Sequence, residues 1–282
     1  MEFALPPHAA TEVRGPTAFG GGARRFWDLL WLYAVADFKY RYAGSLLGYF
    51  WALLRPVALA AVLFVVITKV LVGASNTPHY GLLLLLNLEL FMFFAEATGS
   101  STYSLTNGEL IRKMPIPHAV QPLAAVLTNT FALIPGVLIV LAFALFSGVE
   151  PTWRWCLLPV LLLALIAFTA ATALLLSTLF LRFRDVGQIW PIGSRFLFYL
   201  TPVLFPIEAV PGGILSAIEV VNPLAPLFAE MRRNIIDPTA PGWFEWADTT
   251  LHEALPCVLF VVVCVAGLVV FVRRAPRAAE EV

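Results

Sequence analysis

Two glutamates, Glu89 and Glu96, lie seven residues apart inside an otherwise apolar stretch of the chain. On a helix this spacing places both carboxylates on one face. Carboxylates at membrane depth act as proton relays or as partners of basic groups. A later apolar stretch carries a second polar stripe of Gln188, Arg195 and Tyr199, which offers such a group. We predict that Glu96 pairs with Arg195 and that both stripes face protein or water. A proton relay through Glu89 or Glu96 is the alternative.

Motifs that would build a catalytic centre are missing from the sequence. It contains no Gly-x-x-x-x-Gly-Lys-Ser/Thr phosphate loop, no His-Glu-x-x-His, no Gly-x-Ser-x-Gly and no cysteine and histidine spacing typical of a metal site. We therefore expect no catalytic residue, no metal and no cofactor on this chain. Any ATP hydrolysis must come from another subunit. The three cysteines, Cys156, Cys257 and Cys264, lie in or beside apolar stretches and are interpreted as small packing residues.

The elements that position these residues are long apolar helices. The chain has 282 residues, of which 60% are hydrophobic and 13% charged, against about 25% charged residues in soluble domains. This composition predicts an all-α integral membrane protein with about six transmembrane helices. The net charge of +0 gives no reason to expect nucleic-acid binding. Apolar runs long enough to span occur near 49–72, 80–101, 119–146, 155–181, 188–205 and 254–272.

Basic residues set the orientation of these spans. With a cytoplasmic N-terminus, most lysines and arginines fall on the cytoplasmic side, as the positive-inside rule requires. Both termini are then cytoplasmic, and the protein is multi-pass in the inner (plasma) membrane. The cytoplasmic side receives Arg24, Arg25, Lys39, Arg41, Glu109, Arg112, Lys113, Arg182, Arg184, Asp185, Arg273, Arg274 and Arg277.

The N-terminal part divides into a tail and a surface helix. Residues 1–22 have prolines and a glycine run but no apolar core, which indicates a flexible cytoplasmic tail before a membrane domain over 23–282. From 24 to 42, apolar residues recur at helical spacing and charged residues lie elsewhere around the helix. An amphipathic helix at the membrane interface is favoured over an additional span. Its apolar positions are Trp27, Leu30, Trp31, Ala34 and Phe38.

Two segments between the spans interrupt the apolar pattern. Residues 107–114 predict a short charged helix on a cytoplasmic loop, either a docking element for a soluble partner or an ordinary solvated loop. The outer segment 206–253 begins with repeated prolines and continues with helices too short to cross. It predicts short re-entrant helices before the last span, which border a pathway or form an external cap.

Five sequence segments occur in a fixed order: Lys39-Tyr-Arg-Tyr-Ala-Gly-Ser-Leu-Leu-Gly-Tyr-Phe-Trp-Ala-Leu-Leu-Arg-Pro56, Glu109-Leu-Ile-Arg-Lys-Met-Pro-Ile-Pro117, Arg182-Phe-Arg-Asp-Val186, Leu200-Thr-Pro-Val-Leu-Phe-Pro206 and Asn222-Pro-Leu-Ala-Pro226. Together they resemble one family, the membrane subunits of type-2 ABC exporters, and among them the polysaccharide-export permeases. The resemblance covers nearly the whole chain after the tail. It implies a homodimer that binds two cytoplasmic ABC ATPase subunits, which hold the ATP and Mg. It also implies membrane lipids as surroundings and a lipid-linked polysaccharide, such as O-antigen or galactan, as substrate.

The resemblance also implies roles for individual residues. The interface helix and the 107–114 helix would contact the ATPases through Arg24, Arg25, Asp28, Lys39, Arg41, Asn107, Glu109, Arg112 and Lys113. An outer gate would include Pro206, Glu208 and Pro211. Because sugar C–H groups stack on aromatic rings, a sugar channel favours aromatic walls. Candidate channel residues are Tyr49, Trp51, Phe91, Phe94, Glu96, Arg195, Phe198 and Tyr199, with core packing as the alternative for each ring.

The function expected from these observations is an ATP-driven permease subunit that exports a lipid-linked cell-envelope polysaccharide. Two alternatives stay open from the sequence. One is a type-2 exporter of drugs or lipids, which would share the fold. The other is a proton-coupled carrier that uses Glu89 or Glu96 and needs no ATPase.

Overall fold

The structure is a bundle of helices. The computed structural model describes residues 22–42, 48–70, 77–106, 117–209, 220–247 and 249–281. These residues form helices and turns and no strand, so the predicted all-α class is confirmed for them. The helices are α1 (Ala23–Tyr42), α2 (Gly48–Val65), the π-helical turn η1 (Val66–Val70), α3 (Tyr80–Thr102), η2 (Ser104–Thr106), α5 (Val120–Phe146), η3 (Trp153–Leu157), α6 (Leu158–Arg182), α7 (Val186–Leu200), η4 (Ile207–Ala209), α9 (Ala225–Ile235), α10 (Trp243–Trp246) and α11 (Thr250–Glu281).

Four helices among the described residues are long and apolar enough to cross a membrane. They are α3, α5, α6 together with η3, and α11. The apolar part of α2 is shorter, Leu53–Thr68, and runs into η1. The predicted count of about six spans therefore exceeds the four helices that meet the length of a full span.

The predicted fifth span, 188–205, is wrong at its outer end, because α7 has 15 residues and stops at Leu200. Its length of about 22 Å, at about 1.5 Å per residue, is shorter than the roughly 30 Å hydrocarbon core. Thr201 is extended, with φ −93° and ψ 144°. The following Pro202 explains this, because a proline disfavours helical geometry in the residue before it.

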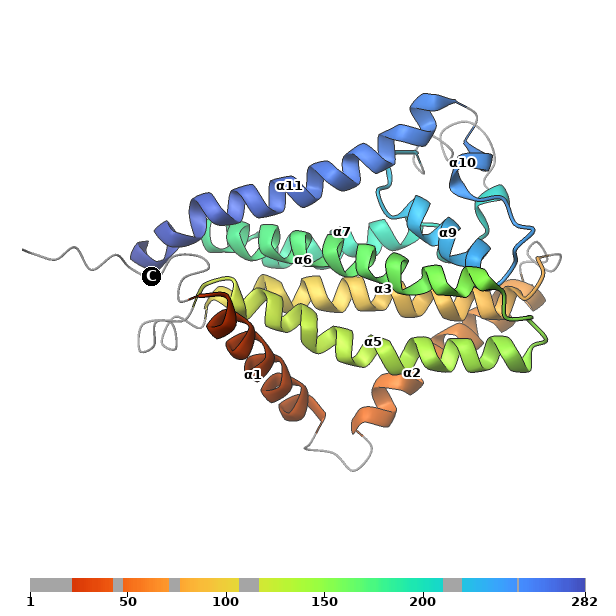
Figure 1. The fold of residues 1–282 in the computed structure, drawn as a ribbon, viewed down its shortest axis with the longest axis horizontal. Helices are drawn as coiled ribbons and strands as arrows, with labels where there is room; N and C mark the ends of the chain where they lie inside the picture. The colour runs from red at the N-terminus through yellow and green to blue at the C-terminus, as the bar shows by residue number, and fades with distance from the viewer. Residues whose placement is uncertain are drawn as a thin grey trace, which may run out of the picture.

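Helix α3 lies at the centre of the bundle, packed against α2, α5, α6 and α7. Helix α11 packs along α6 at the edge of the bundle (Figure 1). The short helices α9 and α10 gather at one end, and the C-terminal end of α11 lies at the opposite end, where α1 also begins (Figure 1). The two ends of the bundle therefore differ, because α1 begins at one end and α9 and α10 lie at the other.

Hydroxyl side chains in the central helices bond mainly to their own backbone. In α3, Thr98 donates to the carbonyl of Phe94 at 2.7 Å and Thr102 to that of Thr98 at 2.9 Å. In α6, three threonines make the same bond four residues back, with distances of 2.7 to 2.9 Å. Such bonds satisfy a buried hydroxyl without a neighbouring helix. The α6 threonines are Thr169, Thr172 and Thr178.

Helix α1 crosses α5 obliquely (Figure 1). Its buried face is Phe26, Leu30 and Ala34, spaced four residues apart. Thr128 of α5 donates a hydrogen bond to the Ala34 carbonyl at 3.2 Å. The predicted apolar face is buried within the protein at Leu30 and Ala34, whereas two tryptophans of that face are 64% and 59% exposed, as residues that face lipid rather than protein would be. These are Trp27 and Trp31.

Candidate functional site

Polar side chains of α3 face α2 and α5. Glu89 is buried on the α5 side, where its carboxylate lies against Gly136. A Cβ atom at position 136 would overlap that carboxylate, so a glycine provides the space for it. Two turns further along α3, Glu96 is more exposed. The two predicted carboxylates therefore share a helix face but have different surroundings.

The partner of Glu96 is Arg55, which belongs to α2. Arg55 Nη1 and Glu96 Oε1 are 2.5 Å apart, and the two side chains are 67% and 47% exposed. The predicted pairing of Glu96 with Arg195 is therefore wrong in this conformation. The reason is that α2 packs beside α3 and brings Arg55 to Glu96, whereas Arg195 is exposed on α7 and forms no ion pair with the residues that the structure describes.

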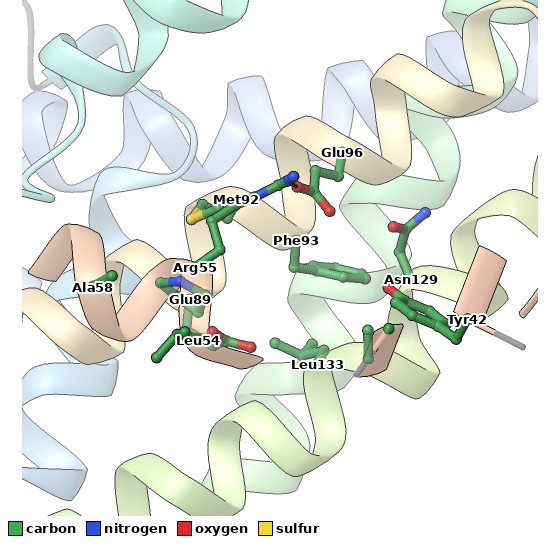
Figure 2. Close-up of a pocket in the computed structure, with 13 residues that line it drawn as sticks. Tyr42, Leu54, Arg55, Ala58, Glu89, Met92, Phe93, Glu96, Asn129 and Leu133 are labelled. Carbon is green, nitrogen blue, oxygen red and sulfur yellow. Dashed lines mark hydrogen bonds and ion pairs between the residues drawn. The ribbon is translucent and has the colours of Figure 1, made fainter. Parts of the chain in front are cut away.

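These groups line a cavity of about 480 Å³ between the end of α1 and helices α2, α3 and α5. Figure 2 shows Arg55 extending past Met92 toward Glu96, and Tyr42 beside Asn129. Burial, and secondly the Glu96 carboxylate, raises the pKa of Tyr42, so its phenol stays protonated at neutral pH. The cavity thus contains two carboxylates, a guanidinium and a phenol among apolar walls. The remaining lining residues are Gly48, Leu54, Pro56, Ala58, Phe93, Ala132 and Leu133.

Such a cavity can accept and donate hydrogen bonds at membrane depth. Its volume lies in the range of about 300–1,000 Å³ that is typical of small-molecule sites. Asn129 donates to the Ala125 carbonyl at 2.7 Å and to Ser100 Oγ at 3.3 Å, which fixes its side chain. The arrangement suits polar, uncharged groups more than anions, because its carboxylates outnumber its one arginine.

The predicted channel rings on α3 are buried inside the bundle. Phe91 is 3% exposed and packs edge-to-face against Phe198, with ring centroids 5.2 Å apart. Phe94 is 1% exposed and stacks with Phe168 at 5.9 Å. The prediction that Phe91 and Phe94 line a channel therefore disagrees with the structure. They pack in the core because α3 is enclosed by its neighbours.

Helix α7 carries three members of the predicted channel set, Arg195, Phe198 and Tyr199. Phe198 is half-buried, whereas Tyr199 is 64% exposed. Arg195 and Gln188 are also exposed and lie on the same side of the helix as Tyr199. Tyr49 and Trp51 belong to α2, and their side chains are outside the described part of the structure. Among the predicted channel residues whose side chains are described, Glu96 of α3 and Arg195 and Tyr199 of α7 are exposed.

The inner part of α7 is attached to α3 by two hydrogen bonds. Trp190 Nε1 donates to Thr98 Oγ1 at 3.1 Å, and the Tyr103 hydroxyl donates to the Gly187 carbonyl at 2.9 Å. Gly187 also fits tightly, because a Cβ there would overlap Phe180 and Tyr103. The start of α7 is thus fixed on α3, while its outward face remains open.

The turn after α7 is held by three side chains, two from α3 and one from the segment before α9. Asn87 of α3 donates to the Pro202 carbonyl at 2.9 Å, and the Tyr80 hydroxyl donates to the Leu204 carbonyl at 2.5 Å. Asn222 donates to the Leu200 carbonyl at 3.0 Å. Irregular backbone at membrane depth needs such partners, because lipid supplies none.

Two of the predicted outer-gate residues lie in this turn and just after it. Pro206 is buried, and Glu208 of η4 pairs with Arg232 of α9, with Nη1 and Oε2 2.6 Å apart. The Arg232 side chain is only 6% exposed and also lies 3.9 Å from Asp237. The third predicted gate residue, Pro211, lies outside the described residues.

The predicted ATPase-contact residues on α1 are exposed. They are Arg24, Arg25, Asp28, Lys39 and Arg41, and Arg41 pairs with Asp37 at 2.8 Å. The other predicted contacts, Asn107, Glu109, Arg112 and Lys113, lie outside the described residues. Burial lowers the pKa of His118 just before α5. Helix α1 therefore offers charged groups along its length, beginning at the end of the bundle where α11 ends (Figure 1).

Sequence reasoning did not single out several of these functional residues. Arg55, Asn87, Asn129, Asn222 and Arg232 form the contacts described above, yet none belonged to the predicted sites. The available signal was the presence of polar side chains within or beside apolar stretches. Burying such a side chain costs free energy, so it is expected to have a partner.

Comparisons with known proteins place the chain in a family. The sequence profile of the ABC-2 type transporter family matches residues 28–236. A protein of Klebsiella pneumoniae named O-antigen export system permease protein RfbA is 27% identical over 260 residues, which cover 90% of this chain and 95% of the relative. A protein of Myxococcus xanthus with the same name is 28% identical over 175 residues, covering 62% of this chain and 66% of the relative. The chain therefore belongs to the ABC-2 type transporter family.

Proposed function

We propose that this chain is the permease subunit of an ATP-driven exporter that moves a lipid-linked polysaccharide across the inner membrane. The substrate class is O-antigen or a similar cell-envelope glycan, taken from the cytoplasmic side. The observation that carries the proposal is the match, over 90% of the chain, to relatives named as O-antigen export permeases. The family membership supports the same type of transporter.

The exposed polar groups support a homodimer with a wet path between the two copies. Arg195 lies on an open face of α7, and the Arg55 and Glu96 side chains are 67% and 47% exposed. A charge that faces hydrocarbon costs about 2.5–3.5 kcal/mol on insertion scales. A second copy that covers these faces, with water between them, removes this cost. In that arrangement Tyr199 offers a ring to the passing glycan, and six spans per subunit include the short α2 and α7.

The α1 helix supports coupling to two cytoplasmic ATPase subunits, which would hold ATP and Mg. Its exposed charges extend from its start to Arg41, while its buried face packs on α5 and extends to the cavity through Tyr42. A push on α1 would therefore reach α5 and the cavity directly. Both termini and α1 would be cytoplasmic, and the 107–114 segment would complete the contact.

Depletion of the protein in its native cell tests the substrate class. We expect a lipid-linked polysaccharide to accumulate on the cytoplasmic side and to disappear from the cell surface. Restoring the wild-type chain should reverse both changes. If no lipid-linked polymer accumulates, and a drug or a phospholipid is retained instead, the proposed substrate is wrong.

Purification from the membrane tests the subunit composition. Tagged protein should bring down a nucleotide-binding subunit, and a charge reversal of Lys39 and Arg41 to glutamate should weaken this association. A matched control is the reversal of Arg154, a partly buried arginine of η3, which packs against α9 at the other end of the molecule. Export that persists without ATP or without any ATPase would favour a proton-coupled carrier.

A further inference from the structure

Two polar contacts hold the segment between α7 and α9 from opposite sides. From α3, Asn87 Nδ2 donates to the carbonyls of Pro202 at 2.9 Å and Val203 at 3.4 Å. From α9, Arg232 pairs with Glu208. Asn87 and Arg232 also line one small cavity of about 10 Å³, together with Pro202 and Phe228. The two contacts therefore meet at a common space.

Each of these two side chains has one polar atom without a hydrogen bond among the described residues. The atoms are Asn87 Oδ1, an acceptor, and Arg232 Nε, a donor. Both residues are buried, at 2% and 5% exposure. A buried polar atom that makes no hydrogen bond loses its full hydration energy, and such atoms are rare in folded proteins.

The orientation of the Asn87 amide is fixed by its bonds. Its nitrogen donates to two backbone carbonyls. Exchanging the amide oxygen and nitrogen would place the oxygen against those carbonyl oxygens, which is unfavourable. The acceptor atom therefore faces away from the turn and needs a donor elsewhere.

We propose that one buried water molecule binds in this cavity, accepting a hydrogen bond from Arg232 Nε–H and donating one to Asn87 Oδ1. The cavity has about the space that a single water needs, and the unpaired atoms of two of its lining residues, Asn87 and Arg232, are one acceptor and one donor. A cation is disfavoured by the Arg232 guanidinium. An anion is disfavoured by Asn87 Oδ1 and by the nearby Glu208 carboxylate.

This water joins α3, the turn after α7 and α9 through one hydrogen-bond network. The turn then has partners on both sides, and the residues predicted as an outer gate, Pro206 and Glu208, are held in place. The turn moves together with α3 and α9 rather than as a separate flap. This proposal concerns the architecture of the chain and does not depend on which substrate is exported.

A structure of the full transporter at a resolution that shows ordered water tests the site directly. We expect density within hydrogen-bonding distance of both Asn87 Oδ1 and Arg232 Nε. If the two side chains are well ordered and the space between them is empty, or if they bond directly to protein atoms, the proposal is overturned.

A pair of neighbouring arginines provides a matched test by mutation. Arg232→Lys removes the Nε–H donor but keeps a positive charge for Glu208. Arg233→Lys makes the same change next to it, where the arginine pairs with Glu245 at a more exposed position. We expect a clearly larger fall in melting temperature for Arg232→Lys and loss of the water density in that variant. Equal falls with the density retained would overturn the proposal.

A double-mutant comparison separates the water from the turn itself. If the water connects the two residues, the double variant Asn87→Leu with Arg232→Lys should lose less melting temperature than the two single variants lose together. The losses from Asn87→Leu and Glu208→Gln should be additive. Additive losses in both pairs, or equal coupling in both, would contradict the water bridge. If Asn87→Leu does not assemble, the density in the wild-type protein decides alone.

Discussion

Helices α3 and α11 show the reverse of the relation between hydropathy and burial that is found in a soluble protein. Among the four long apolar helices, α3 has the lowest mean hydropathy and α11 the highest. Yet 78% of the most apolar stretch of α3 is buried, against 17% of that of α11. In water the more apolar helix would be inside. In a bilayer the lipid covers apolar surface, so the polar groups determine which helix lies at the centre.

The side chains of the two helices show this division directly. The buried residues of α3 include Asn87, Glu89, Thr98, Ser101 and Thr102. The large hydrophobic residues that α11 exposes are all aliphatic: Leu251, Val258, Val261, Val262, Val265, Leu268, Val269 and Val272. Polar groups are therefore concentrated where protein atoms can bond to them. Four substitutions test this comparison.

The largest effect is expected from a carboxylate on the lipid face of α11. Val262 is 53% exposed near the middle of its apolar stretch. Val262→Asp should cost about 2.5–3.5 kcal/mol, because hydrocarbon offers the charge no partner. The amount of folded protein in membranes and its melting temperature measure the loss. Val262→Leu is the control and should be near neutral. A harmless Val262→Asp would mean that this face of α11 is covered by protein or water.

The next largest effect concerns a point where α11 approaches α6 closely. A Cβ at Gly267 would overlap the backbone carbonyl of Ala171, which cannot move aside cheaply. Gly267→Ala should therefore destabilise by about 1–3 kcal/mol, although alanine favours a helix. Gly99→Ala in α3, where a Cβ meets nothing within 4 Å, should not destabilise. Equal melting temperatures for the two variants would show that α11 can shift on α6.

A smaller effect is expected where α3 satisfies the turn after α7. Tyr80→Phe removes the hydroxyl that donates to the Leu204 carbonyl. The loss should be about 0.5–1.5 kcal/mol, because one hydrogen bond disappears and the packing of the ring stays. Tyr199→Phe is the matched control, since that ring is 64% exposed. Thermal unfolding of both variants in the same detergent measures the difference. A loss only in Tyr199→Phe would contradict the assigned role of Tyr80.

The smallest effect on stability is expected from the ion pair between α2 and α3. Because the Arg55 and Glu96 side chains are 67% and 47% exposed, the pair should contribute about 0.2–1 kcal/mol. Glu96→Arg places two positive charges together and should impair export more than stability. The exchange of both, Arg55→Glu with Glu96→Arg, should restore export in part. An exchange no better than the single change would show that the residues act separately.

The sequence was sufficient to predict an all-helical membrane protein and its family. The apolar runs and the ordered motifs carried that information, because they depend on composition and local spacing. Which residues pair with each other depends on how the helices pack, and the residue types alone do not reveal that packing. Glu96 could pair with any arginine at a similar depth, and the position of α2 beside α3 selects Arg55 over Arg195. Phe91 and Phe94 could line a channel or a core, and the central place of α3 decides for the core.

The break in the fifth apolar run shows a second limit of the sequence. Residues 201–205 continue the apolar composition of α7, so hydropathy extended the helix through them. The prolines indicated an irregularity but not how its backbone would be satisfied. The partners, Tyr80, Asn87 and Asn222, come from distant parts of the chain.

The self-bonded threonines of α6 have a consequence for motion. Thr169, Thr172 and Thr178 bond to carbonyls of their own helix, so these bonds travel with α6 when it shifts. When α6 slides along a neighbouring helix, none of these three bonds must break and re-form. The start of α7, in contrast, would have to give up its bonds from Trp190 and Tyr103 before it could leave α3. These three bonds therefore do not resist a shift of α6, whereas the bonds from Trp190 and Tyr103 resist the separation of α7 from α3.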